Sequence, residues 1–169
     1  MREVGMIRWL WLSVLVVALD QATKWMAEAA LDPYLPVPLL PSLNLTLMYN
    51  EGAAFSFLAG AGGWQRWFFV VLALAVTCGL TVWLHRLKSA ERMTAIGVAL
   101  VIGGAVGNVI DRALTGRVVD FIDFYVGTWH WPAFNLADSA ITLGVALLLL
   151  ATLTEGQPAP ARDVEGRLP

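Results

Sequence analysis

Long apolar stretches separated by short polar segments dominate this chain. The clearest stretch runs from Trp67 to Leu84, 18 residues without a charged side chain. As a helix it would cover about 27 Å of a hydrocarbon core that is about 30 Å thick. A second uncharged stretch runs from Met93 to Ile110 and has Asn108 as its only amide side chain. Both stretches predict transmembrane helices.

The first apolar stretch reaches the length of a span only if it includes charged residues. Residues 9–19 form an apolar run of 11, so a spanning helix of about 20 residues must continue through Asp20 and Lys24. This segment is also similar to a secretory signal peptide, because a short apolar core follows Arg2 and Arg8. Asp20 and Lys24 separate that core from the small residues at which cleavage would occur. We therefore expect an uncleaved first helix.

The last apolar stretch gives the fourth predicted span. Ser139 to Thr154 contains 16 residues, and a full span must begin near Asn135 and include Asp138 in its first turn. Residues 155–169 are rich in Pro, Gly and charge and predict a disordered cytoplasmic tail. The pattern thus predicts a single four-span membrane domain over residues 1–154.

Polar and apolar side chains alternate between the first two spans. Residues 43–50 read Leu-Asn-Leu-Thr-Leu-Met-Tyr-Asn, which is the period of a strand. Residues 50–52 supply a turn, and Ala53 to Phe57 is predicted as a returning strand. Between the last two spans, Trp129 and Trp131 suit the membrane interface, and the linker 123–131 carries no visible constraint. We expect an all-α integral membrane protein with four transmembrane helices and a small extracytoplasmic sheet between the first and second spans.

The positions of Lys and Arg predict the orientation in the membrane. With four spans, the termini and the loop 86–92 share one side of the membrane. That side carries Arg2, Arg8, Arg86, Lys88, Arg92, Arg162 and Arg167, and the other carries Lys24, Arg66, Arg112 and Arg117. By the positive-inside rule both termini are cytoplasmic.

The composition excludes several classes of protein. With 58% hydrophobic and 14% charged residues and a mean hydropathy of +0.67, the chain is not an ordinary soluble domain, in which about 25% of residues are charged. A net charge of -2 leaves no basic excess for phosphates, so no nucleic-acid partner is expected. One cysteine, Cys78, and two histidines predict no disulfide, no metal site and no cofactor. We expect Cys78 to be a packed thiol inside the second span.

Five aspartates fall at the outer ends of the spans or between them, while the middle of every span is free of charge. They are Asp20, Asp111, Asp120, Asp123 and Asp138. Ionisable groups at membrane depth are costly and mark functional sites by default. Ala99, Gly103 and Gly107 recur every four residues before Asp111, and this small-residue face predicts close helix packing beside it.

Five sequence blocks, taken together, are similar to one known family. They are residues 20–24 (DQATK), 49–56 (YNEGAAFS), 103–112 (GGAVGNVIDR), 118–121 (VVDF) and 134–139 (FNLADS). Their order and their positions at the span edges resemble bacterial lipoprotein signal peptidase, also called signal peptidase II, over about residues 8–153.

The resemblance implies an aspartic endopeptidase of the bacterial inner membrane, with its active site at the outer leaflet edge. It would remove signal peptides from diacylglyceryl-modified prolipoproteins, cutting amino-terminal to the lipid-modified cysteine. Its partners would be these substrates and membrane lipid, and we expect a monomer. The family's catalytic pair corresponds to Asp120 and Asp138. Supporting or substrate-binding roles correspond to Asp20, Lys24, Asn50, Asn108, Asp111, Arg112 and Asn135.

The residues themselves are compatible with this chemistry and leave simpler roles open. Two adjacent carboxyl groups share one proton and so provide both an acid and a base. Asp20 and Lys24 are four residues apart and form a helical ion pair on that spacing. Arg112 either snorkels or holds a loop or a substrate carbonyl, and Asn135 is placed to cap the fourth helix. We expect Asp123 to be a solvated loop carboxylate.

Three other functions remain as alternatives. A small proton-coupled transporter would also use intramembrane carboxylates, although the cytoplasmic halves of the spans carry none. A non-catalytic lipid- or helix-binding module would not need paired carboxylates. A metal hydrolase would need more oxygen ligands than one carboxylate pair supplies.

Overall fold

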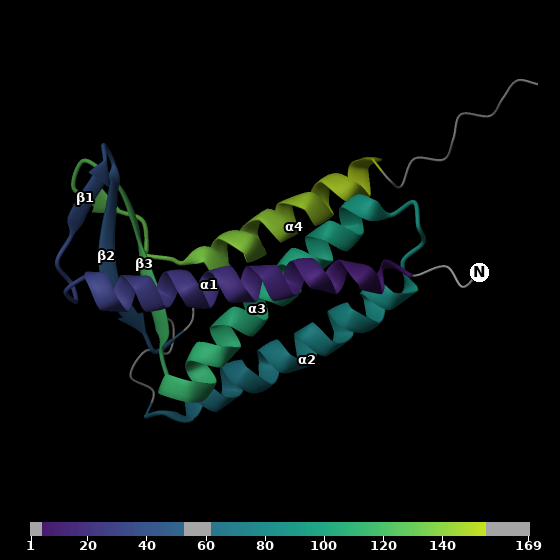
Figure 1. Cartoon of the computed structure of the whole chain (residues 1–169), viewed down its shortest axis with the longest axis horizontal. Helices are drawn as coiled ribbons and strands as arrows, with labels where there is room; N and C mark the ends of the chain where they lie inside the picture. The colour runs from purple at the N-terminus through teal and green to yellow at the C-terminus, as the bar shows by residue number, and fades with distance from the viewer. Residues whose placement is uncertain (1–4, 53–61, 155–169) are drawn as a thin grey trace, which may run out of the picture.

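Four long helices and a small sheet form the part of the chain that the computed structural model describes, residues 5–52 and 62–154. The helices are α1 (Leu10–Ala30), α2 (Trp64–Arg86), α3 (Arg92–Thr115) and α4 (Leu136–Thr154), and the short 3-10 helix η1 (Met6–Trp9) leads into α1. All four are long and apolar enough to cross a membrane. The sheet lies at one end of the helices (Figure 1). The predicted fold class is confirmed.

Helix α3 is the core of the helical part. More than half of its apolar window is buried, whereas α1, α2 and α4 expose most of theirs. Small residues allow its neighbours to approach closely, because a Cβ on Gly103 would lie 2.9 Å from the carbonyl oxygen of Ser13 in α1. On another face, Gly97 of α3 and Gly144 of α4 meet backbone to backbone. The predicted small-residue face therefore does pack helices together.

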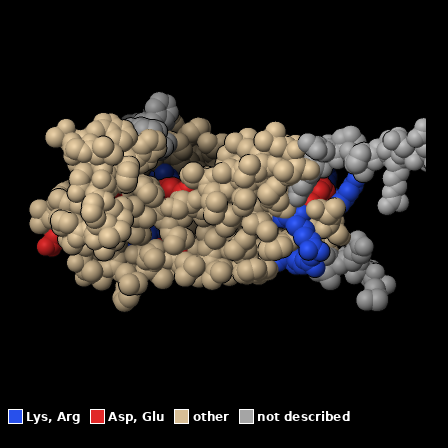
Figure 2. Space-filling view, turned by 90° about the horizontal axis from the view of Figure 1, so that it is seen from above, with Lys and Arg blue, Asp and Glu red and all other residues tan. Residues whose placement is uncertain are grey.

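On the face seen in Figure 2, the described residues show no charged side chains across a broad band over the helices. Charged side chains gather at the end that carries the α2–α3 connection, and in a hollow between the sheet and the helices (Figure 2). Bulky apolar residues of α2 such as Trp67, Phe68 and Val71 are exposed. In a chain whose helices span a membrane, such exposed apolar side chains contact lipid.

Both long connections at the sheet end contribute strands to one antiparallel sheet in the order β1-β2-β3-β4. The strands are β1 (Val37–Leu40), β2 (Leu43–Asn50), β3 (Val118–Val126) and β4 (Trp129–His130). The predicted strand over residues 43–50 is confirmed, and the predicted return over 53–57 lies outside the described residues. The prediction of an unconstrained linker over residues 123–131 is wrong, because this segment ends β3 and forms β4.

Pairing of β2 with β3 brings together segments that are far apart in the sequence. Asn44 faces Asp123 and Met48 faces Asp120, with a register shift between Leu45 and Met48. This shift lets Asn50 reach Val118, at the start of β3. The sheet thus carries Asp120 to the ends of α3 and α4.

One further expectation fails and one falls outside the structure. Cys78 is exposed on α2 rather than packed as a buried thiol, because α2 is lipid-facing over most of its surface. The predicted tail, residues 155–169, lies outside the described residues.

The Gly97–Gly144 contact predicts the effect of a single methyl group. A Cβ on Gly144 would lie 2.7 Å from the carbonyl oxygen of Gly97, so the α3–α4 contact must open in Gly144→Ala. Overpacking of this kind costs about 1–3 kcal/mol. We expect a lower Tm in detergent for Gly144→Ala. The control is Gly79→Ala on α2, where an added Cβ meets nothing within 4 Å. Equal Tm values for the two variants would contradict this account of helix packing.

Candidate active site

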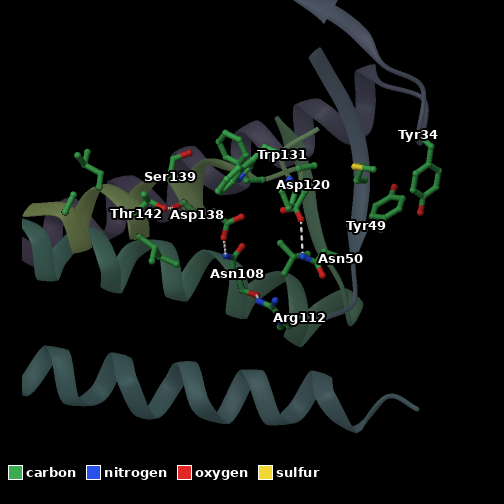
Figure 3. A pocket seen from close by; sticks show the side chains of 18 residues that line it. Tyr34, Tyr49, Asn50, Asn108, Arg112, Asp120, Trp131, Asp138, Ser139 and Thr142 are labelled. Atoms are coloured by element: carbon green, nitrogen blue, oxygen red, sulfur yellow. Dashed lines mark hydrogen bonds between the residues drawn. The ribbon is translucent and has the colours of Figure 1, made fainter. Parts of the chain in front are cut away.

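A cavity of about 1080 Å³ opens where the sheet meets α3 and α4. Figure 3 shows Asp120 and Asp138 inside it, together with Asn50, Asn108 and Arg112. These five residues come from β2, α3, β3 and α4. The connections at the sheet end and the ends of two helices therefore build one polar site.

Asp120 lies on β3 and is almost fully buried. Its Oδ1 accepts a hydrogen bond from Asn135 Nδ2 at 2.7 Å, and its Oδ2 accepts a longer one from Asn50 Nδ2 at 3.3 Å. Burial is the main reason that the pKa of Asp120 rises to about 7, and the nearby charge of Asp138 adds to the effect. The two amides and the charge of Lys24 oppose this rise.

Asp138 occupies the first turn of α4, where a reciprocal cap fixes it. Its backbone N–H donates to Asn135 Oδ1 at 2.9 Å, and its own Oδ2 accepts from the Asn135 backbone N–H at 3.3 Å. This is the pattern of a capping box with an aspartate at its third position. Asn108 Nδ2 of α3 donates to the other oxygen of Asp138 at 2.8 Å. The predicted helix cap at Asn135 is confirmed.

Asn135 joins the two carboxyl groups. It is fully buried, and it contacts Asp120 through its side chain and Asp138 through both side chain and backbone. Its Nδ2 also lies within hydrogen-bond distance of the Val119 carbonyl and Asn108 Oδ1. One side chain thus sets the relative position of β3 and the start of α4.

A buried ion cluster lies beside this site. Lys24 Nζ is 2.8 Å from Asp20 Oδ2 and 2.8 Å from Asp111 Oδ2, and it donates to Asn108 Oδ1 at 3.0 Å. The predicted Asp20–Lys24 ion pair is confirmed, and it extends from α1 to α3. Asp20 also accepts from the Ala137 backbone N–H at 2.9 Å, which ties α1 to the first turn of α4.

Arg112 fixes the end of β2 and leaves one donor without an acceptor. Its Nη2 donates to the Gly52 carbonyl at 2.7 Å, and its Nη1 donates to the Asn108 carbonyl at 3.4 Å. Its Nε is buried and has no hydrogen-bond partner among the residues that the structure describes. The loop-holding role that the sequence allowed is therefore present.

The structure corrects the expectation for Asp123. This residue is buried in the sheet and accepts hydrogen bonds from Asn44, Thr46 and His130. It is separate from the cavity and is not a solvated loop carboxylate. The reason is that residues 118–126 form a strand whose partner on β2 presents polar side chains to Asp123.

Several contributing residues were missed by the sequence reasoning. Gln21 donates to Asp111 Oδ1 at 2.8 Å. Its place beside Asp20, in the sequence block 20–24, was the signal that could have indicated it. The cavity also includes Tyr34, Tyr49 and Trp131 towards the sheet, and Ile141 and Ala146 along α4. A helical spacing from Asp138 would have indicated the α4 residues, whereas nothing local indicates Tyr34.

Metal binding has no support in the geometry of the described residues. They contain no group of three or more His, Cys, Asp or Glu side chains arranged to hold a metal ion. The lysine and the asparagine amides already occupy most of the carboxylate oxygens near the cavity.

The comparisons with known proteins agree with this geometry. Residues 12–154 match the family model described as signal peptidase (SPase) II. A protein of Aeromonas hydrophila named lipoprotein signal peptidase is 56% identical over 147 residues, which is 85% of this chain and 87% of that protein. One of Hydrogenovibrio crunogenus with the same name is 52% identical over 141 residues, 83% of this chain and 82% of that protein.

A solved structure shares the architecture as well. A bacterial membrane enzyme determined by the in meso method superposes with a TM-score of 0.77 at 32% identity, covering 96% of this chain and 94% of that one. The family match spans all four helices and the sheet. This chain belongs to the signal peptidase II family.

Proposed function

We propose that this protein is a membrane aspartic endopeptidase that removes signal peptides from diacylglyceryl-modified prolipoproteins, with Asp120 and Asp138 as its catalytic pair. The observation that carries the assignment of the pair is that Asn135 donates to both carboxyl groups, to Asp120 from its side chain and to Asp138 from its backbone N–H. Both carboxyl groups line one cavity. Family membership supports the activity. Proton-coupled transport is not favoured, because the family model and the similar relatives are those of a signal peptidase.

The two carboxyl groups divide the work of hydrolysis. Burial, and then the charge of Asp138, raises the pKa of Asp120 to about 7, so Asp120 holds the shared proton below that pH. Ionised Asp138 takes a proton from a water molecule while the water oxygen attacks the scissile carbonyl carbon. Asp120 gives its proton to the carbonyl oxygen. The C–N bond then breaks as the leaving nitrogen takes the proton from Asp138, and Asp120 regains its own.

Neutral amides and one arginine surround the pair. Asn108 donates to Asp138, and Asn135 donates to Asp120. Because both amides are neutral, they add no charge that would favour loss of the shared proton. Arg112 also lines the cavity, and the Gly52 carbonyl holds its Nη2 in place. In this arrangement the substrate backbone is oriented by donors that are already held in place.

The shape of the cavity suits a lipid-modified substrate. Its α4 side is lined by Ile141, Leu143 and Ala146, which extend from the carboxyl groups into the apolar part of the protein. An apolar signal peptide and a diacylglycerol group would both be confined to this depth, which replaces a search in solution by diffusion in the membrane. The bond to be cut is the one amino-terminal to the lipid-modified cysteine.

The proposed location is the inner membrane, with both termini in the cytoplasm and the cavity at the outer leaflet edge. The density of Arg and Lys between α2 and α3, at the end opposite the sheet, supports this orientation.

In Ser89→Cys and Asp32→Cys, each in a Cys78→Ser background, a membrane-impermeant maleimide should label only residue 32 in intact spheroplasts. Both positions are exposed and lie on opposite sides of the predicted spans. Labelling of residue 89 from outside would overturn the orientation.

The activity and the pair are tested in one assay. Purified protein in detergent is incubated with a diacylglyceryl-modified prolipoprotein, and loss of the signal peptide is measured. Asp120→Asn and Asp138→Asn should each lower kcat/KM by at least about 10²- to 10⁴-fold, because each removes one half of the acid-base exchange. The double variant should be little worse than either single one.

Controls separate catalysis from folding and substrate choice. Asp32→Asn, at an exposed site, should cleave at the wild-type rate. Asp120→Asn should keep its fold. Its Tm should gain on that of the wild type as pH rises from 5 to 7, because in this range the unfolded wild-type chain has lost the proton that folded Asp120 still holds. Equal cleavage of an unmodified prolipoprotein would contradict the proposed substrate class, and an active Asp120→Asn would contradict the pair.

The pH profile of kcat/KM should fall on the alkaline side with an apparent pKa near 7. Below that value Asp120 carries the proton that the reaction needs, and above it the pair is doubly ionised. Initial rates between pH 5 and 9 at low substrate concentration measure this limb. A profile that stays flat to pH 9 would show that the proton on Asp120 is not used.

A further inference from the structure

A polar cluster on one face of the sheet is not used by the mechanism above. It contains Asn44 and Thr46 of β2, Asp123 of β3 and His130 of β4. Asp123 Oδ2 accepts from Asn44 Nδ2 at 3.1 Å and from Thr46 Oγ1 at 3.2 Å, and Asp123 Oδ1 lies 2.7 Å from His130 Nδ1. Asp123 and its two β2 partners are buried, whereas the His130 side chain is 52% exposed.

The hydrogen bonds keep Asp123 ionised. Burial alone would raise the pKa of Asp123, but the bonds from His130, Asn44 and Thr46 together outweigh burial and leave this pKa below its usual value. An ionised carboxylate only accepts, so Nδ1 of His130 carries the hydrogen in this contact. The His130 ring also stacks on Tyr125, with ring centroids 5.3 Å apart. These contacts hold a short strand to the sheet.

The held strand leads directly into the wall of the active-site cavity. Residues 131–134 follow His130 and all line the cavity, and Asn135 comes next. At its far end this wall is fixed by Phe134, whose backbone pairs with Ile122. At its near end the Trp131 backbone N–H donates to the Phe124 carbonyl at 2.8 Å. Before it, β4 has only two residues, both exposed, and so short a pairing is a weak restraint that side-chain contacts can reinforce.

We propose that Asp123 and His130 are positioning residues that hold the wall formed by residues 131–134 in place for substrate binding. This inference rests on the proposed function of the cavity. The pair does not touch the carboxyl groups, and Asn135 keeps its own bonds to Asp120 and Asp138. Loss of the contact should therefore weaken substrate binding and leave the chemical step nearly intact.

Substitutions at His130 test this with little risk to folding, because its side chain is half exposed. His130→Ala should raise KM for the lipid-modified prolipoprotein about five- to tenfold, with kcat within about twofold of wild type, as expected for loss of a charged hydrogen bond. His130→Asn keeps a donor near the Nδ1 position and should recover most of this loss. The matched control is His85→Ala, an exposed histidine near the end of α2, which should leave both constants unchanged.

A double-mutant cycle identifies the contact. Asp123→Asn should raise KM in the same direction, and the Asp123→Asn/His130→Ala double variant should be less impaired than the product of the two single effects. A KM change below twofold in His130→Ala, or a loss carried by kcat, would overturn the proposal. Cleavage by wild type with an inactive Asp120→Asn shows, in the same assay, whether the proposed function itself holds.

Discussion

A single buried ammonium group organises the polar end of this helical bundle. Lys24 is almost fully buried, and burying an unpaired charge at membrane depth is strongly unfavourable. Its three hydrogens meet three acceptors, on Asp20, Asp111 and Asn108, at distances of 2.8, 2.8 and 3.0 Å. The cation is satisfied only when α1 and α3 lie in this register. The helix packing and the ion cluster therefore require each other.

The orientation of Asn108 follows from this cation. Because its Oδ1 faces Lys24, its Nδ2 faces Asp138 and presents a donor to that carboxylate. Close approach of the helices is part of the same arrangement, since a Cβ on Gly107 would lie 2.6 Å from Asp20 Oδ2. From the sequence, Gly107 predicts only helix packing. In the structure its missing side chain also leaves room for the Asp20 carboxylate.

The sequence predicted which residues lie at this end of the spans, because the length of an apolar run decides where Asp20 and Asp138 fall relative to the membrane. It did not predict their partners. The contacts of Lys24 with Asn108 and of Asn44 with Asp123 join residues 84 and 79 positions apart, and only the helix register and strand pairing determine them. Asp123 was misread for this reason, since its donors on β2 belong to a different connection.

Charge balance gives a reason for the shared proton that does not depend on either carboxyl group alone. Asp20 and Asp111 flank Lys24, and Asp120 and Asp138 lie within electrostatic reach of Arg112. Four carboxyl groups therefore face two cations in a poorly solvated region. Full ionisation would leave two uncompensated negative charges, and one proton on Asp120 removes one of them. The ion cluster that holds the helices together thus adds to the excess negative charge that a proton on the proposed catalytic pair reduces.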